Sequence, residues 1–345
     1  MKLLAVTNMY PTAETPGAGT FIEQQIKGLR EIGLDVNVLH LDRRRKGMNV
    51  YFRMAKQLRR EIDKSQPNVV HAMYGGVMAD HLTRIVKDRA TVVTLHGSDL
   101  LGEHLSGVVR KVIAGYGVWA SWQAAKRAQR VITVSKALKN VLPRNIDRSK
   151  VEVIANGIDL ARFKPLERNQ CRRRLGWLPE NFHVLFPANS GDPVKRPQLA
   201  QAAVECLRRS GIRVVMHCLR GIPNSEVPIW INASHVVLLT SLHEGSPTII
   251  KEALACNTPV VSVDVGDVSE RLNGIEGCYM ALPDPTELAA KLALVYAGRG
   301  SVAGRERIEE FSLEHIARRI HGVYQEALRS SNGQGTLSIN AVSRG

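Results

Sequence analysis

Short apolar runs rich in Val, Ile and Leu alternate with longer amphipathic stretches along the whole of this 345-residue chain. This alternation is typical of parallel strands that are joined by helical crossovers and covered on both faces. The runs divide between the two halves of the chain, which suits two doubly wound α/β sheets in series better than one long sheet. The predicted strands are residues 2–7, 35–41, 68–72, 91–95, 130–134, 151–154, 183–187, 213–218, 235–240, 259–263 and 277–280.

The segment 154–165 separates the two sets of strands. It contains Asn156-Gly157 and Lys164-Pro165, and such pairs mark turns and loops. The last residues are rich in Ser, Gly and Asn, which predicts a disordered tail. The predicted parts are a Rossmann-like domain over residues 1–160, a second over residues 161–311, a long helix over about 312–329, and the tail 330–345.

The composition indicates a globular protein that works in the cytoplasm. Hydrophobic residues make up 44% of the chain, the mean hydropathy is −0.12, and no apolar run approaches the ~20 residues of a membrane span. The first eight residues are too short and polar for a signal peptide. Five cysteines without C-x-x-C spacing indicate unpaired thiols in a reducing compartment.

Positive charge is concentrated in the first half of the chain. The formal net charge is +15, and residues 1–160 carry 25 Lys and Arg against 14 Asp and Glu. The densest cations are Arg43, Arg44, Arg45, Lys46, Arg53, Lys56, Arg59, Arg60 and Lys64. Apolar residues recur between them at helical spacing, which predicts an amphipathic basic helix. They are Val50, Tyr51, Met54, Leu58 and Ile62.

Such a basic helix suits a solvated face, an anionic membrane surface or a nucleic acid. The chain has no nucleic-acid motif and no cluster of stacking aromatic residues, which disfavours the third role. Each cation near an anionic bilayer contributes about 1 kcal/mol, so several together would matter.

One stretch combines a buried strand, a turn and a helix start. The strand 235–240 leads to Ser246, a good N-cap residue, and to Pro247, which suits the first helical position. The free N–H groups that follow and the positive end of the helix dipole make an anion site. Glu244 and Glu252 flank this site, where carboxylates can accept hydrogen bonds from sugar hydroxyls. A phosphate beside sugar hydroxyls is the chemistry of a sugar nucleotide.

The two glutamates separated by seven residues, with Glu-Gly and Ser-Pro between them and Pro259-Val260-Val261 after the helix, resemble the donor-site signature of glycosyltransferase family 4. Members of this family are retaining, nucleotide-sugar-dependent enzymes. Their GT-B fold has two Rossmann-like doubly wound parallel-sheet domains that face a central cleft. The resemblance implies that the first domain binds the acceptor, that the second binds the nucleotide sugar, and that the last helix crosses back to the first domain.

The same resemblance gives roles to residues of this stretch. Glu252 would hold ribose hydroxyls and Glu244 the hydroxyls of the sugar. The donor diphosphate would lie on the helix start, which includes Gly245, Ser246 and Thr248.

A glycine-containing loop follows the first predicted strand, at the strand end where ligands of open α/β sheets bind. Gly17 and Gly19 let the backbone approach a ligand, and Thr20 and Glu23 predict a capping box at a helix start. A dinucleotide fingerprint would need a glycine at Ile22, so a dehydrogenase is disfavoured. The family's glycine that matches Gly19 contacts the donor phosphate, so the resemblance makes Gly19 a donor-binding residue.

His96 follows the predicted strand 91–95. The family's matching histidine lies close to the transferred sugar and its phosphate, so the resemblance gives His96 substrate positioning and charge stabilisation. We expect Asp99 to cap the next turn and His71, after an adjacent strand, to be structural.

The chain departs from the family pattern in two places. The family usually has an arginine where Asn189 falls and a lysine matching Lys195, and both bind the pyrophosphate. Lys195 is kept, and Arg196 beside it is a candidate to replace the missing arginine; cations in a low-dielectric cleft stabilise a leaving phosphate. The segment 219–234 is also shorter than in typical members. This shortened form resembles the subgroup of exopolysaccharide and teichuronic-acid assembly.

The sequence has no Asp-x-Asp pair and no His/Cys cluster with ligand spacing, so we expect neither a metal nor another cofactor. The expected function is transfer of a hexose-type sugar from a nucleotide diphosphate donor to a hydroxyl of a lipid-linked or saccharide acceptor, in cell-surface polysaccharide or glycoconjugate synthesis. The enzyme would be cytoplasmic or peripheral on the inner face of the plasma membrane. Candidates for contact with membrane or acceptor are Arg43, Arg44, Arg45, Lys46, Arg59 and Arg60.

Two alternatives stay open. A nucleotide-sugar 2-epimerase of the same fold would need no acceptor, and the basic first domain counts against it. A non-catalytic glycosyltransferase-like scaffold would bind a nucleotide sugar or a partner without turnover.

Overall fold

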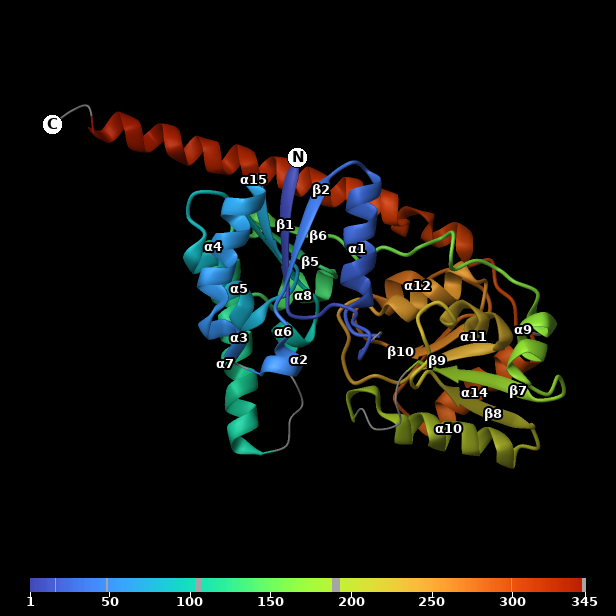
Figure 1. The fold of residues 1–345 in the computed structure, drawn as a ribbon. Coiled ribbons are helices and arrows are strands. Elements are labelled where there is room, and N and C mark those ends of the chain that lie inside the picture. The colour runs from blue at the N-terminus through green and yellow to red at the C-terminus, as the bar shows by residue number, and fades with distance from the viewer. Residues whose placement is uncertain (16, 48, 103–106, 188–192, 299, 343–345) are drawn as a thin grey trace. The chain divides into compact units, whose positions relative to one another are not determined.

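The chain folds into two compact units (Figure 1). The computed structural model describes residues 1–15, 17–47, 49–102, 107–187, 193–298 and 300–342. The first unit comprises Met1–Gly157 together with Leu313–Gly345, and the second comprises Ile158–Ser312. The chain therefore leaves the first unit inside the predicted boundary segment and returns to it for its last helix.

The first unit is built on a six-stranded parallel sheet in the order β2-β1-β3-β4-β5-β6. Its strands are β1 (Lys2–Thr7), β2 (Asp35–His40), β3 (Val69–Ala72), β4 (Ala90–Leu95), β5 (Arg130–Thr133) and β6 (Val151–Val153). All the residues of β3 and β4 are buried, as expected of central parallel strands with helices on both faces. The predicted fold class is confirmed for this unit.

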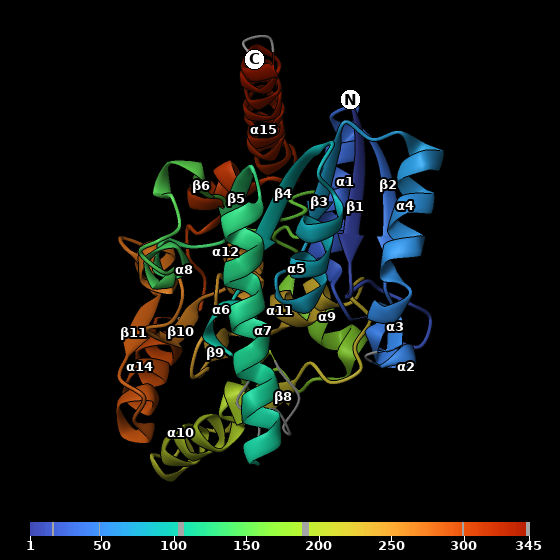
Figure 2. The same cartoon turned by 90° about the vertical axis from the view of Figure 1, so that its left-hand side faces the viewer.

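Helices cover both faces of this sheet, as Figures 1 and 2 show. On one face lie α1 (Thr20–Glu31) and α15 (Leu313–Val342); on the other lie α4 (Met54–Ser65), α5 (Gly76–Ile85) and α7 (Val108–Arg127). Shorter helices are α2 (Arg43–Lys46), α3 (Asn49–Phe52), α6 (Ser98–Leu101), α8 (Lys136–Val141) and the 3-10 turn Arg148–Lys150.

The last helix, α15, is held to the sheet by buried polar contacts. Tyr324 is fully buried, and its hydroxyl hydrogen-bonds His71 Nδ1 at 2.8 Å, while His71 Nε2 bonds Thr94 Oγ1 at 2.7 Å. His71 is thus structural, as expected. The helix runs to Val342, past the start of the predicted disordered tail at Ser330. Residues 343–345 lie outside the described part, and disorder of the tail stays a prediction.

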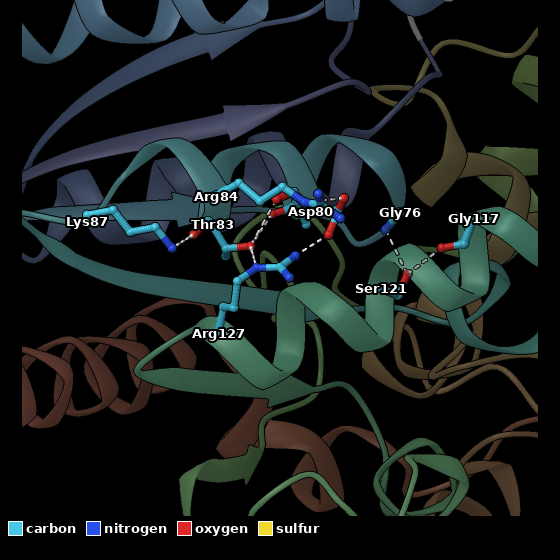
Figure 3. Close-up of polar contacts among 9 residues, drawn as sticks. Gly76, Asp80, Thr83, Arg84, Lys87, Gly117, Ser121 and Arg127 are labelled. Carbon is cyan, nitrogen blue, oxygen red and sulfur yellow. Dashed lines mark hydrogen bonds and ion pairs between the residues drawn. The ribbon is translucent and has the colours of Figure 1, made fainter.

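An ionic cluster joins α5 to α7 (Figure 3). The carboxylate of Asp80, 1% exposed, pairs with Arg84 Nε at 3.0 Å on its own helix and with the guanidinium of Arg127 on α7. Arg127 Nε also donates to Thr83 Oγ1 at 3.2 Å. Two cations on one buried carboxylate compensate for its lost hydration, which fixes how the two helices pack.

The basic segment after β2 is three helices, α2, α3 and α4, and its apolar residues are part of the unit's core. Val50, Tyr51, Met54, Leu58 and Ile62 are all buried there. The predicted amphipathic pattern is thus present, but it is spread over three helices where one was predicted. Exposed positions are Arg43, Arg45, Arg59 and Arg60; Arg44 and Lys46 lie in α2, and their side chains are outside the described part. No helix in the described ranges is long and apolar enough to cross a membrane.

The second unit has a five-stranded parallel sheet in the order β11-β10-β9-β7-β8, which again confirms the predicted fold class. Its strands are β7 (Phe182–Phe186), β8 (Val214–Cys218), β9 (Val236–Leu239), β10 (Val260–Val263) and β11 (Tyr279–Ala281). Helices α10 (Pro197–Arg209) and α14 (Pro285–Ala297) pack together on one face. The other helices are α9 (Arg168–Leu175), α11 (Val227–Ala233), α12 (Thr248–Ala255) and α13 (Val268–Leu272), with 3-10 turns at Pro193–Lys195 and Arg305–Phe311.

We predict that Tyr324→Phe destabilises the first unit by about 1–3 kcal/mol, because a buried nitrogen of His71 loses its hydrogen-bond partner. Thermal unfolding of the purified variant measures the effect. Arg318→Gln is the matched control on the same helix, since it breaks only an exposed pair with Glu314 and should leave the midpoint unchanged. Equal shifts for the two variants would show that the buried contact does not hold α15.

Candidate functional site

The loop between β9 and α12 in the second unit brings together two predicted site residues. Glu244 Oε1 lies 2.5 Å from Lys195 Nζ and accepts a hydrogen bond from Ser241 Oγ at 2.7 Å. The side chains of Glu244 and Lys195 are 15% and 27% exposed, so both are partly accessible. A cation and a carboxylate at the carboxyl end of a parallel strand occupy the usual ligand-binding edge of such a sheet.

Arg196 has a different setting from Lys195. Its Nε donates to the carbonyl of Thr240 at 2.6 Å and its Nη2 donates to the carbonyl of Ser241 at 2.9 Å. The hydroxyl of Thr240 in turn donates to the Lys195 carbonyl at 2.7 Å. Arg196 has a left-handed backbone, with φ of 48°. These contacts fix the segment that carries Lys195, and sequence reasoning missed both Thr240 and Ser241.

The start of α12 differs from the prediction. The helix begins at Thr248 with Pro247 as its N-cap, and no side chain caps it. Ser246 was expected to cap it, but its hydroxyl donates to Asp267 Oδ2 at 2.9 Å and accepts from Lys251 Nζ at 2.6 Å. Charged partners at these distances make stronger hydrogen bonds than a backbone N–H. The N–H of Ile250 donates to the Pro247 carbonyl, while the N–H groups of Thr248 and Ile249 have no helical carbonyl four residues before them and can serve the anion site.

Glu252 lies on the second turn of α12 and is 8% exposed. Burial raises the pKa of its carboxyl to about 7, and the charges of Lys251 and Arg162 oppose this shift. Near neutral pH the carboxyl therefore exists in both protonation states. In either state it can accept a hydrogen bond from a ligand hydroxyl.

Gly266, in the loop after β10, was not predicted to belong to the site. It has φ of 63°, and a Cβ there would lie 2.7 Å from the carbonyl oxygen of Gly245. The loop after β10 thus packs its backbone directly against the Glu244–Gly245 backbone. The signal in the sequence was a glycine just beyond the predicted strand 259–263, at the same sheet edge.

In the first unit, Gly19 is the N-cap of α1 and has a left-handed backbone, with φ of 69°. Its carbonyl accepts hydrogen bonds from the N–H groups of Ile22 and Glu23. The predicted capping box was wrong, because Thr20 already lies inside the helix and glycine takes the cap. A Cβ at Gly19 would lie 2.6 Å from the Met9 carbonyl oxygen, so only glycine fits.

His96 lies at the end of β4 and is 9% exposed. Its Nε2 donates to the carbonyl of Met73 at 3.0 Å, which leaves Nδ1 as an acceptor; Nδ1 is buried and has no hydrogen-bond partner among the described residues. Burial lowers the pKa of His96 to about 4. Tyr74 stacks on the ring. The side chain is therefore a neutral acceptor, and its roles in substrate positioning and charge stabilisation stay predictions.

Asp99 anchors the loop that holds His96. Its carboxylate accepts backbone N–H groups from His96 at 3.0 Å, Gly97 at 2.7 Å and Gly75 at 3.1 Å. Burial raises the pKa of Asp99, and these hydrogen bonds oppose the shift. Its role is structural, as expected, but it ties two strand-end loops together.

Two hollows lie on the first unit near the basic segment. One has a volume of about 110 Å³, and its lining includes Asn8, Arg43, Tyr51, Tyr74, Tyr116 and Gly117. The other has about 690 Å³ and is lined by Arg45, Asn49, Val50, Phe52, Arg53 and Gln57.

Asn189 lies outside the described residues. Within the described ranges there is no group of three acidic, His or Cys side chains that could hold a metal ion.

The sequence matches two models of glycosyltransferase families, one in each unit. The model of Glycosyltransferase Family 4 matches residues 15–162, and that of Glycosyl transferases group 1 matches residues 190–297. The chain belongs to the family 4 glycosyltransferases. The predicted family and enzyme class are thereby confirmed.

A curated relative agrees with this family, and solved structures agree with the fold. The glycosyltransferase is 27% identical over 337 residues to TuaC of Bacillus subtilis (strain 168), which is assigned to teichuronic acid biosynthesis; the match covers 78% of this chain and 82% of TuaC. The fold is similar to that of sucrose-phosphate synthase from Thermosynechococcus elongatus (TM-score 0.77, 16% identity, 96% and 100% covered). It is also similar to Anabaena Alr3699/HepE in complex with UDP and glucose (TM-score 0.70, 18% identity, 94% and 99% covered).

We predict that Gly266→Ala displaces the Glu244–Gly245 loop of this glycosyltransferase and weakens binding of its donor. The added Cβ would overlap the Gly245 carbonyl, and a positive φ costs a non-glycine residue about 1–2 kcal/mol. Gly176→Ala is the matched control, since Gly176 has φ of 68° but open space around its Cβ. Thermal unfolding and donor titration compare the two variants. A larger loss for Gly176→Ala would contradict the prediction.

The buried imidazole of His96 predicts a loss of stability in acid. Its pKa is about 4 in the folded state and about 6.5 when unfolded, so below pH 6.5 the unfolded chain binds more protons. Between pH 6 and 5 the free energy of unfolding of the unmodified protein should fall by about 1 kcal/mol more than that of the His96→Gln variant. Chemical denaturation of both proteins at pH 8, 7, 6 and 5 measures this difference. Parallel curves for the two proteins would exclude the contribution.

Proposed function

We propose that this glycosyltransferase moves a hexose-type sugar from a nucleotide diphosphate donor to a hydroxyl of a lipid-linked or saccharide acceptor, in cell-surface polysaccharide or glycoconjugate synthesis. The observation that carries the proposal is the ion pair between Lys195, in the 3-10 turn before α10, and Glu244, in the loop that precedes α12. Lys195 and the free N–H groups of α12 suit a diphosphate, and Glu244 suits sugar hydroxyls. The solved Alr3699/HepE complexes with UDP and UDP-glucose support a donor of this class.

The ion pair explains how binding of the donor would free Glu244 to contact the sugar. A diphosphate competes with Glu244 for Lys195, because it carries more negative charge than one carboxylate. Glu244 then loses its cation and is free to accept hydrogen bonds from the sugar. Binding of the donor thus replaces the Lys195–Glu244 contact with two charge-assisted contacts, one between Lys195 and the diphosphate and one between Glu244 and the sugar.

We infer the remaining roles from the family resemblance and the local geometry. Gly245, Ser246 and Thr248 contribute backbone donors near the phosphates, while Glu252 accepts hydrogen bonds from ribose hydroxyls. Gly19, in the first unit, is kept as a donor-binding candidate on the resemblance alone. Arg196 acts indirectly, by holding the segment of Lys195. Asn189 is kept as a donor-binding candidate. His96 accepts a hydrogen bond from a substrate hydroxyl through Nδ1.

The transfer proceeds with retention, as the resemblance implies. The acceptor oxygen forms its bond to the anomeric carbon from the face that the leaving group occupies. The bond from that carbon to the phosphate oxygen breaks, and the acceptor proton passes to the departing phosphate. Lys195 and the dipole of α12 stabilise the charge that develops on the diphosphate, so we propose that no metal is needed.

The first unit offers a place for the acceptor. Aromatic faces of Tyr51, Tyr74 and Tyr116 and the cation of Arg43 line its smaller hollow, a combination that suits a sugar ring with polar or anionic substituents. Around the larger hollow, Phe52 is 86% exposed between basic residues. Together with exposed cations of α4, including Arg59 and Arg60, this surface supports peripheral contact with an anionic membrane on the cytoplasmic side.

We predict that one of UDP, GDP or ADP stabilises the enzyme against thermal unfolding. At a concentration 100 times its Kd, a ligand adds about 2.7 kcal/mol to the free energy of unfolding, which raises the melting point measurably. Lys195→Ala should abolish the shift, because the diphosphate loses its cation. Lys136→Ala, an exposed lysine of the first unit, is the control and should keep the shift.

Two outcomes would contradict the proposal. If no nucleoside diphosphate shifts the melting point, the second unit has no working donor site. If donor binds but Glu244→Ala leaves the cellular role of the protein intact, the chain acts as a scaffold and not through sugar transfer.

A further inference from the structure

Lys251 is a buried cation to which the proposed function gives no role. It lies in the middle of α12 and has 0% exposure, and burial lowers its pKa. Its Nζ donates a hydrogen bond of 2.6 Å to Ser246 Oγ, a neutral group at the start of the same helix. A buried ammonium without a direct carboxylate partner loses much of its hydration energy, so a compensating negative charge is expected nearby.

The carboxyl groups nearest to Lys251 are either shared with another cation or only partly ionised. The hydroxyl of Ser246 in turn donates a hydrogen bond to Asp267 Oδ2. Asp267 is 4% exposed, and the same Oδ2 lies 3.4 Å from Arg271 Nε. Asp267 therefore faces both Lys251 and Arg271, and Arg271 also pairs with the exposed Glu270 at 3.4 Å. The other nearby carboxyl is Glu252, and it is only partly ionised near neutral pH. The positive charge of the buried Lys251 is thus only partly compensated behind the start of α12.

The surroundings of the fully buried Lys251 screen its charge only weakly, whereas Arg271 is 18% exposed. The guanidinium of Arg271 lies 4.5 Å from the ring centre of Phe311, and Lys251 Nζ lies 5.9 Å from it. Phe311 is itself buried. Charges in such a place act over longer distances than charges in water. Their field adds to the positive end of the α12 dipole, on the side where Gly245 and Ser246 present their backbone.

We propose that Lys251 is a positioning residue of the donor site that acts through Ser246: it holds the turn before α12 against Asp267 and places a buried positive charge behind the donor diphosphate. This proposal rests on the proposed function, in which the start of α12 binds the donor diphosphate. It adds a residue that strengthens this binding. A bound diphosphate compensates the remaining charge of Lys251. The two side chains have opposite effects on the ligand, since Lys251 attracts its charge and Asp267 repels it.

A purely structural role for Lys251 would have a different signature. Loss of a contact that only shapes the turn weakens binding of every ligand of the site by a similar factor. Loss of a charge weakens binding in proportion to the charge of the ligand. A series of ligands that share a base but differ in phosphate number separates the two.

The experiment titrates the diphosphate that the thermal panel selects (UDP, GDP or ADP) and its monophosphate and nucleoside into the native protein, Lys251→Met and Asp267→Asn by calorimetry. Lys251→Met nearly keeps the length of the side chain and removes its charge together with its hydrogen bond to Ser246. It should weaken diphosphate binding about 10-fold or more and change nucleoside binding less than 2-fold. Asp267→Asn should tighten diphosphate binding about 3-fold or more.

The inference is overturned if both variants weaken binding, or if diphosphate and nucleoside change by the same factor. The melting point of each variant is measured in parallel; if Lys251→Met does not fold, Asp267→Asn carries the test alone, because damage to the fold does not tighten binding. Native protein that binds none of the diphosphates refutes the proposed function itself. Native binding without the opposite shifts refutes only the role of Lys251.

Discussion

The carbonyl groups at the end of β9 need hydrogen-bond donors, and the arrangement of the donor site depends on how that need is met. Thr240 and Ser241 are buried where the strand ends, and the sheet no longer supplies partners. The guanidinium of Arg196 donates to both carbonyls. Because Arg196 is fixed in this way, the preceding Lys195 is placed against Glu244. A requirement of the backbone thus sets the position of a functional cation.

The first unit solves a similar problem with the opposite charge. Three N–H groups of the strand-end loops converge on Asp99, and their hydrogen bonds to it fix the backbone of His96. Residues that contact no ligand therefore determine where the site residues lie. Substitutions of such residues would disturb the site without removing any functional group.

The fold was predictable because buried parallel strands leave a strong local pattern. Each apolar run corresponds to a strand within one or two residues, from Lys2–Thr7 to Tyr279–Ala281. The ligand-binding edge was predictable for the same reason. Features that depend on distant partners were not: Ser246 has the sequence of an N-cap but bonds Lys251 and Asp267, and the apolar face of the basic segment packs into the core. Gly266 matters only because another loop lies against it.

The path of the chain through its two units affects how the protein can be made. The second unit, Ile158–Ser312, is inserted into the first, and the N–H of Ile158 donates to the carbonyl of Phe311 where the chain enters and leaves. The helix that carries Tyr324 and completes the first unit is therefore synthesised last. A ribosome must produce the whole second unit before the first can close over His71. The second unit is continuous in sequence, so it can finish folding first, with the unit that begins the chain completed after it.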